Sequence, residues 1–333
     1  MRSKKNVETT KLAKGETLKK GFVNYVEMAK SAVDWTLFCS YQLKPKFSDG
    51  IYNILQLPSM QIVYTDMEGG IMFDYIAPEG SVTFSIMKNI AEKACIDQMK
   101  LETDMIIVTD DRKIYNLTCS GRVEFLDISL HKNADPKLRK KLTEAVDKYF
   151  IDNDQKMAKL IKGFVKEFTQ NSPLDTQTSI QIEKQITEAM LQLLDEQEAQ
   201  TPRFTKSEKI ALEIKQKLFK HMDGKLTIAS FAKEYTISAK SLQNAFRSLF
   251  DLTPNQFMRL LKLNLVHHEL IQSKSSQTSV LKVAQKWGFA HMGRFSKFYT
   301  ELFLENPSVT LKTDTPLPDG MKEHCVERKE EIV

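Results

Sequence analysis

One short segment, residues 279–307, constrains the fold of this chain more than any other part of it. Its apolar residues follow helical spacing up to Gly288, where glycine permits the positive φ of a sharp turn. A second helix is expected to follow, and its buried side carries Phe295, Phe298, Tyr299 and Leu302. The outward side of that helix is basic. The segment therefore predicts a helix-turn-helix, whose second helix can enter a DNA groove.

The same pattern occurs about fifty residues earlier by direct count, over residues 226–250. Ser238 is a good N-cap for the second helix of this copy, because its hydroxyl can accept a bond from a free backbone N–H. The inward residues at helical spacing are Leu242, Ala245, Phe246 and Leu249. Between the two copies, Pro254 suits the first position of a long apolar helix. An unrelated helical hairpin would explain one such segment but not two.

The outward face of the second helix in the first copy is polar. It carries Lys240, Ser241, Gln243, Asn244 and Arg247. Gln and Asn can read adenine through two hydrogen bonds, whereas Lys and Arg suit guanine or phosphate. In the second copy, the outward face carries Met292, Arg294 and Lys297. These residues, together with His291 and Gly293, are the candidate DNA contacts.

Residues 206–311 resemble the DNA-binding domain of the AraC/XylS family of bacterial transcription regulators. The motif W-G-F-x-H-(hydrophobic)-G-R-F, here Trp287–Phe295, is similar to that of the ethanolamine-operon regulator subfamily. The resemblance implies seven helices and two recognition helices in adjacent major grooves, about one DNA turn apart. The base-reading residues that it implies are Lys240, Gln243, Asn244, Met292, Gly293, Arg294 and Lys297.

The chain departs from the family pattern at the ends of both recognition helices. Asp251 and Leu304 stand where the family usually has glycine. A leucine in the left-handed conformation costs about 1 kcal/mol or more, so the second helix is expected to end differently. His291 replaces the usual Ser or Asp N-cap.

Base reading by the second recognition helix is expected to be weak. Met292 and Gly293 are poor hydrogen-bonding readers, so this helix should contribute mostly phosphate and groove-shape contacts. Arg294 is the residue expected to contact a guanine. Alternatively, Arg294 has a structural role and pairs with a carboxylate of the linker region, which would hold the turn in place.

The distribution of charge favours DNA as the partner of the C-terminal part. Residues 201–312 hold 18 Lys and Arg against 8 Asp and Glu, a net charge of +10. Because the whole chain is +5, the remainder sums to −5. A basic surface confined to one domain is typical of phosphate binding.

Length and composition predict two folded domains. The chain has 333 residues, 41% hydrophobic and 27% charged, which is ordinary for a soluble globular protein. No apolar run is long enough for a transmembrane helix, and the start lacks the apolar stretch of a signal peptide. The four cysteines are scattered without a CxxC pair, which suits a reducing cytoplasm.

The expected fold class is α+β, with a β domain preceding the helices. Residues 1–40 are expected to form an arm, with a helix or a strand over 21–39. Residues 41–134 show short apolar runs broken by Gly, Pro and Asp, which predict a sandwich or a small barrel. Tyr41–Leu43, Asp104–Val108 and Leu126–Leu130 resemble the N-terminal cupin-like β domain of the same subfamily.

From residue 135 to 200 the apolar period becomes helical. These stripes can form intramolecular core or a dimer seam, and the family resemblance favours the seam. Residues 198–204 are expected to be the linker to the DNA-binding domain over 201–312, and 313–333 a disordered tail.

The β domain is better interpreted as a sensor or a dimerisation platform than as an enzyme. Metal-dependent chemistry on such a domain needs several His and carboxylate ligands, yet His131 is the only histidine in the first 200 residues. No metal or other cofactor is expected. An apolar effector could enter a barrel mouth, although the same residues can be ordinary core. They are Phe47, Ile54, Tyr64, Met72, Tyr75 and Phe84.

The sequence thus predicts a cytoplasmic, dimeric, sequence-specific transcription regulator, and an activator rather than a repressor. Its expected partners are double-stranded promoter DNA, RNA polymerase, a second copy of the chain and a small-molecule effector. The alternative hypothesis is a protein-interaction module with degenerate DNA readout that regulates a partner transcription factor. Met292 and Gly293 are the residues that favour this alternative.

Overall fold

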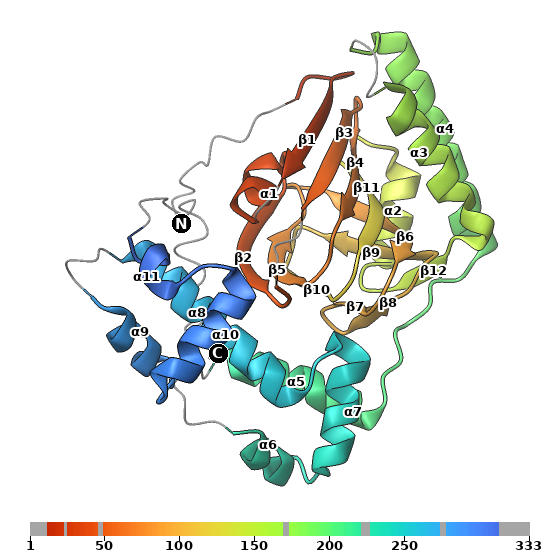
Figure 1. Cartoon of the computed structure of the whole chain (residues 1–333). Helices are drawn as coiled ribbons and strands as arrows, with labels where there is room; N and C mark the ends of the chain where they lie inside the picture. The colour runs from red at the N-terminus through yellow and green to blue at the C-terminus, as the bar shows by residue number, and fades with distance from the viewer. Residues whose placement is uncertain are drawn as a thin grey trace, which may run out of the picture.

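The architecture comes from a computed structural model of the chain. It describes residues 12–22, 25–45, 49–168, 173–220, 227–273 and 278–312. Figure 1 shows a β domain at the centre, a helical layer on one side and a helical C-terminal domain on the other. No helix in these described ranges is long and apolar enough to cross a membrane.

The larger sheet of the β domain has seven strands, all paired antiparallel. Their order across the sheet is β1 (Thr17–Phe22), β3 (Gly50–Gln56), β4 (Met60–Met67), β11 (Val123–Leu130), β6 (Val82–Ile90), β9 (Met105–Asp110) and β12 (Tyr149–Ile151). The central strands are buried on both faces, and the buried residues include polar ones such as Thr65 and Asp127.

The smaller sheet has five strands, also antiparallel. Their order is β2 (Thr36–Gln42), β5 (Ile71–Ile76), β10 (Tyr115–Cys119), β7 (Ala94–Ile96) and β8 (Met99–Leu101). An apolar cluster with residues from both sheets fills the space between them. Two separate sheets around one core form a sandwich, which was one of the two predicted arrangements.

The β domain begins earlier than residue 41. Strand β1 and most of β2 lie within the expected arm, with the helix α1 (Tyr25–Ser31) between them, so the 21–39 segment contains a helix and part of a strand (Figure 1). Strand β1 is at the edge of its sheet, where Lys19 and Lys20 can face solvent. A half-polar edge strand lacks the apolar alternation by which strands are recognised in a sequence.

The connecting segment is mostly helical, as predicted, with one interruption. It contains α2 (Pro136–Glu144), a short 3-10 turn η1 (Asn153–Gln155), α3 (Lys156–Phe168) and α4 (Thr176–Glu196). Tyr149 and Phe150 were expected in a helix but form β12 beside β9. Asp147 at φ 63° breaks the helical path before them, and aromatic side chains suit a sheet.

The apolar stripes of these helices cover the outer face of the seven-stranded sheet. Ile182, Ile186 and Met190 of α4 are buried in one cluster with β4, β6 and β11 residues. The stripes therefore form intramolecular core, and this stripe of α4 does not provide the dimer seam that the family resemblance favoured.

The C-terminal domain contains seven helices in its described part, the number implied by the resemblance. They are α5 (Lys206–Lys220), α6 (Ile228–Glu234), α7 (Ala239–Phe250), α8 (Pro254–Gln272), α9 (Val280–Lys286), α10 (Met292–Phe303) and α11 (Pro307–Thr310). This domain packs on the outer face of the five-stranded sheet, where Tyr41, Met72 and Cys95 join its core cluster.

Candidate nucleic-acid interface

Side-chain caps fix where the helices of the first motif, α6 and α7, begin. Thr227 and Ser230 form a capping box at the start of α6, each side chain bonding to the other residue's backbone N–H at 3.1 Å. Ser238 caps α7 as predicted, because its hydroxyl accepts the Ser241 N–H at 3.0 Å. The Ser241 hydroxyl also lies 2.8 Å from that of Ser238, so it belongs to the cap.

The turns of the two motifs repeat each other closely. Thr236 at φ 50° and Gly288 at φ 83° each follow the first helix. In both turns the next backbone N–H returns to a helix carbonyl, from Ile237 to Ala232 and from Phe289 to Ala284, at 3.0 Å each. The positive φ expected at Gly288 is confirmed. The two turns therefore begin in the same backbone conformation, although the second is one residue longer before its N-cap.

The inward faces of both second helices are buried as predicted. The buried residues are Leu242, Ala245, Phe246 and Leu249 of α7, and Phe295, Tyr299 and Leu302 of α10. Phe298 is only half-buried, and the Arg259 guanidinium lies 4.3 Å from the centre of its ring. Long helix α8, with Pro254 at its start and a Thr253 cap, packs between the motifs.

The outward face of α7 is free to meet a partner. Lys240, Gln243, Asn244 and Arg247 are exposed, and their side chains form no hydrogen bond or ion pair with the residues that the structure describes. They lie on one face of a helix with a polar character suited to bases and phosphates.

The outward face of α10 offers fewer polar groups. Met292 is half-buried and packs against the domain core, so its side chain is partly withdrawn from the surface. Gly293 is exposed, and a Cβ added there would meet no atom within 4 Å. Exposed His291 stands at the N-cap without a side-chain cap bond, because imidazole replaces the usual short oxygen-bearing side chain.

Arg294 and Lys297 remain as the long cationic side chains on this face. Arg294 is exposed and forms no ion pair within the described ranges, so the structural tie considered as its alternative role is not observed there. Lys297 lies 3.8 Å from Glu301 one turn away, both well exposed, a contact that contributes little.

Both recognition helices end in the same conformation, contrary to the expectation for the second. Asp251 has φ 57° and ψ 20°, and Leu304 has φ 57° and ψ 21°. Each backbone N–H closes the last turn onto a helix carbonyl. Leu304 is 65% exposed, so its side chain gains little from packing to offset the backbone cost. The surrounding fold imposes the left-handed conformation on Leu304 despite the steric cost of its side chain.

Counting from the N-caps aligns the two recognition helices. Gly293 then corresponds to Lys240, and Lys297 to Asn244. The second turn is one residue longer, so an alignment that starts from Thr236 and Gly288 would instead pair Lys240 with Met292. Ser296 occupies the place of Gln243 and was missed as a candidate contact. Its half-buried hydroxyl is a shorter reader than Gln, and counting from the N-cap would have identified it.

Part of the positive charge of the domain is already neutralised. Lys217 pairs with Glu234, and Lys286 pairs with Glu269 at 2.8 Å. Glu269 also accepts the indole N–H of Trp287 at 2.8 Å, which fixes the end of α9 against α8. Such pairs hold the motifs in place and leave the cations of α7 and Arg294 for a partner.

A polar contact between the domains was not visible in the sequence. The Lys215 ammonium of α5 is buried against the outer face of the five-stranded sheet, where it donates to Asn116 and, at 3.2 Å, to Thr118. Asn116 in turn donates to Asp74 at 2.7 Å. The contact joins α5 of the C-terminal domain to the β domain, while the outward polar side chains of α7 and α10 stay exposed.

The expected effector residues do not form a single set. Tyr64 and Phe84 belong to the cluster beneath the helical layer, because their side chains point to the outer face of the seven-stranded sheet. Met72 points to the C-terminal domain from the outer face of the five-stranded sheet. These three side chains therefore come from three different strands and do not surround a common cavity.

The remaining three expected effector residues have different positions. Ile54 and Tyr75 lie between the two sheets, and of the two only Tyr75 lines the cavity found there. Phe47 lies outside the described residues. No group of three or more His, Cys, Asp or Glu residues suited to a metal ion occurs in the described ranges.

Residues 231–313 match the protein family described as "Helix-turn-helix domain". The chain is 31% identical over 93 residues to the probable thc operon regulatory protein of Rhodococcus erythropolis, covering 28% of each protein. It is also 31% identical over 87 residues to the XylDLEGF operon transcriptional activator of Pseudomonas putida, covering 26% of this chain and 27% of the relative. The chain thus spans under a third of the length of these curated relatives.

Two solved structures resemble larger parts of the chain at low identity. The AraC-like transcriptional activator CuxR is 12% identical, with a TM-score of 0.37 over 72% of this chain and 86% of CuxR. ToxT from Vibrio cholerae O395 is 12% identical, with a TM-score of 0.29 over 84% of this chain and 97% of ToxT.

Proposed function

We propose that this protein is a sequence-specific, double-stranded-DNA-binding transcription regulator. The observation that carries the proposal is the pair of helix-turn-helix motifs, whose turns begin with the same backbone hydrogen bond, on a domain of net charge +10. The exposed Lys240, Gln243, Asn244 and Arg247 are the residues assigned to the first DNA half-site, and Arg294 and Lys297 to the second. The role is regulatory and not enzymatic.

The finer assignments belong to the same proposal. The Trp287–Phe295 motif supports a place near the ethanolamine-operon regulators of the AraC/XylS family. The relatives named as an operon regulator and a transcriptional activator support activation, with RNA polymerase at promoter DNA as the target. The protein acts in the cytoplasm as a homodimer. Its N-terminal domain, over about residues 17–196, serves as the sensor or dimerisation platform.

A gel-shift titration with the full chain tests this function. The probe is the promoter region nearest its own gene, the competitor is a scrambled duplex of equal length, and each titration runs at two salt concentrations. Phosphate contacts release counterions, so affinity should fall steeply with salt, while the preference for the promoter over the competitor remains. Absence of salt-sensitive binding would contradict the proposal.

The alternative function is a protein-interaction module with degenerate DNA readout. Two observations favour it, namely the half-buried Met292 and the missing side chain at Gly293. The same titration separates the two functions, because such a module would bind promoter and scrambled DNA equally weakly. It would instead co-sediment with a partner transcription factor.

A further inference from the structure

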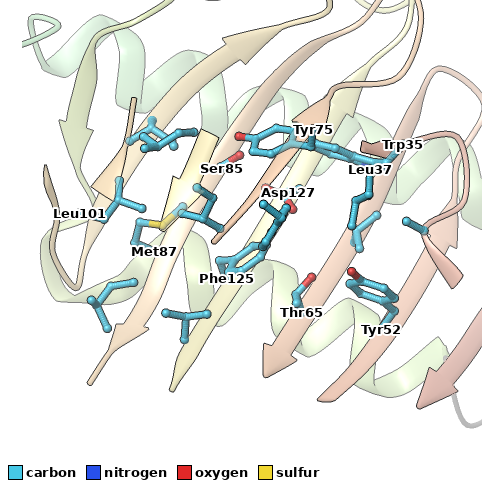
Figure 2. A pocket seen from close by; sticks show the side chains of 18 of the residues that line it. Trp35, Leu37, Tyr52, Thr65, Tyr75, Ser85, Met87, Leu101, Phe125 and Asp127 are labelled. Atoms are coloured by element: carbon cyan, nitrogen blue, oxygen red, sulfur yellow. The ribbon is translucent and has the colours of Figure 1, made fainter. Parts of the chain in front are cut away.

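A cavity of about 60 Å³ lies between the two sheets of the N-terminal domain (Figure 2). Phe125 and Met87 line it from the seven-stranded sheet, and Phe73 and Leu117 from the five-stranded sheet. The lining is mainly apolar. At roughly 10–15 Å³ per water, the space equals about four to six waters, which suits one small ring or a short hydrocarbon chain.

A short polar row crosses one wall of this cavity. Asp127 of β11 pairs across the sheet with Ser85 of β6 and with Val63 of β4, and Thr65 lies two residues beyond Val63 on the same face. Three adjacent strands thus place a carboxyl between two hydroxyls. Figure 2 shows Asp127 near the middle of the lining, with Ser85 and Thr65 on either side.

The carboxyl of Asp127 has no cation to balance it inside the cavity. Among the described lining residues there is no Lys, Arg or His, and Asp127 is 7% exposed. Burial raises its pKa to about 7, although a hydrogen bond from the Ser85 hydroxyl acts in the opposite direction. A buried carboxyl with so little compensation costs stability that an apolar residue would not, so its presence indicates a functional role.

Two further polar atoms at the cavity lack hydrogen-bond partners among the described residues. They are the Thr65 hydroxyl, on a side chain that is 1% exposed, and the indole N–H of Trp35. Buried polar atoms are nearly always hydrogen-bonded in folded proteins. The Thr65 hydroxyl oxygen, on the strand next to Asp127, can accept a hydrogen bond from a donor group that occupies the cavity, whereas the Trp35 N–H is itself a donor and is not partnered by such a group.

We propose that this cavity binds a compact hydrocarbon amine whose ammonium group pairs with Asp127 and donates to Thr65. The proposal rests on the proposed role of the N-terminal domain as a sensor, and it names the chemical class of the ligand. The hydrocarbon body fills the space against Phe125 and Met87. The ammonium supplies the cation that the site lacks.

Other head groups match the site less well. A ligand carboxylate would find no cation among the described lining residues and would face the carboxyl of Asp127. An alcohol can donate one hydrogen bond but carries no charge. When an ammonium binds to the protonated form of Asp127, the carboxyl proton leaves to the buffer, so the complex holds one ammonium and one carboxylate.

The test compares three probes that share one ring, which are cyclopentylamine, cyclopentanol and cyclopentanecarboxylate. Calorimetry on the full chain at pH 7.5 should show the amine binding at least about tenfold more tightly than either of the others, a difference of about 1.4 kcal/mol. In two buffers of different ionisation enthalpy, amine binding should release protons. Tightest binding of the carboxylate, or no binding of the amine at millimolar concentration, would overturn the proposal.

Variants locate the effect at the cavity. Asp127→Asn, nearly equal in volume, should weaken amine binding at least about tenfold and leave alcohol binding within about twofold. Thr65→Val should weaken amine binding by a smaller factor. This variant tests the proposal if Asp127→Asn does not fold. Glu188→Gln on the exposed face of α4 is the matched control and should change nothing. Unchanged amine affinity in Asp127→Asn would refute the pairing.

The failure of this proposal is distinguishable from failure of the proposed function. The same protein preparation is titrated with promoter DNA without any probe. Salt-sensitive promoter binding together with absent amine binding would contradict only the ligand assignment. Amine binding without promoter binding would contradict only the DNA-binding function.

Discussion

Asn264 and Gln42 hold the two domains together through a pair of reciprocal hydrogen bonds. The Gln42 backbone N–H donates to Oδ1 of Asn264 at 2.7 Å, and Nδ2 of Asn264 donates to the Gln42 carbonyl at 2.8 Å. The side chain of Asn264, 2% exposed, thereby completes the edge of β2 as a neighbouring strand would. The Gln42 side chain also donates to the Leu302 carbonyl of α10 at 2.6 Å.

The first prediction removes this contact. Asn264→Ala should lower the free energy of unfolding by roughly 1–3 kcal/mol, because two backbone groups of Gln42 lose their partners in a buried place. It should also speed proteolysis in the linker near residue 200. Asn255→Ala, exposed on the same helix, is the control and should stay within about 0.5 kcal/mol. Equal effects of the two variants in chemical denaturation would contradict the role of Asn264.

The second prediction uses two glycines with open space around them. Gly293 in α10 and Gly163 in α3 are both exposed, and a Cβ at either meets nothing within 4 Å. Replacing each with Ala should stabilise the fold by up to about 1 kcal/mol, because Ala loses less backbone entropy in a helix.

Only Gly293→Ala should also weaken promoter binding, because the added methyl group projects from the face assigned to the DNA groove. Gly163→Ala is the matched control for this measurement. A gel-shift titration of both variants beside the wild type decides the matter. If Gly293→Ala bound the promoter as the wild type does, close approach of this helix to DNA would be disproved.

The third prediction concerns the left-handed cap of α10. Leu304→Gly should raise the free energy of unfolding by about 1 kcal/mol, since glycine adopts this conformation without the steric cost of a Cβ. Asp251→Gly at the equivalent cap of α7 should raise the free energy of unfolding by less, because Asp tolerates the left-handed conformation better than Leu. Thermal denaturation measures both. A destabilised Leu304→Gly would show that its side chain has a packing role.

The fourth prediction is a pH dependence caused by Asp127. Its pKa is about 7 in the folded protein and about 4 when unfolded, so the folded state holds the extra proton between these values. Stability should therefore fall as pH rises from about 4 to 7, by up to about 1.4 kcal/mol per pH unit, and then level off for this group. Neighbouring Tyr52 and Tyr75 have raised pKa values and stay neutral throughout.

Asp127→Asn should remove this part of the pH dependence. Its stability relative to the wild type should increase between pH 5 and pH 7 and stay constant from pH 7.5 to 8.5. Urea denaturation at each pH gives the free energies. If the difference in unfolding free energy between Asp127→Asn and the wild type were the same at every pH, the Asp127 carboxyl would have an ordinary pKa.

The sequence predicted the helical elements better than the edges of the sheets. Strands β5 and β11 lie in the region over residues 41–134 that was expected to form strands, because short, mainly apolar runs stand there between turn residues. Strand β12 has three residues, and β1 is half polar, so neither has a period long enough to distinguish a strand from its surroundings.

The two candidate sites differ in how far the sequence could predict them. The recognition face of α7 follows from helical spacing alone, because all its residues lie on one element. A cavity between two sheets depends on strand pairing, which local patterns do not give. Tyr64 and Tyr75 have similar surroundings in the sequence, yet Tyr64 faces Lys162 of the helical layer and Tyr75 faces the cavity. Asp127 lies between Leu126 and Ile128 in a strand that also holds Glu124 and Ser129, and it gave no signal of its own.

The central claim is that both motifs contact DNA and that the first reads the bases more strictly. A base-by-base substitution scan of the bound promoter site, with the wild type and with Gln243→Ala, Asn244→Ala and Arg294→Ala, tests it most directly. The scan should show two contacted segments about one helical turn apart. The stronger discrimination, roughly 1–3 kcal/mol at each base pair read, should lie under α7 and disappear in Gln243→Ala and Asn244→Ala.

Arg247→Ala serves as the control in this scan. It should weaken all sequences alike, because its side chain is assigned to the phosphate backbone. The segment under α10 should show shallow preferences that Arg294→Ala removes. The account would be contradicted by a flat profile, or by a sharply specific segment under α10 that survives Arg294→Ala.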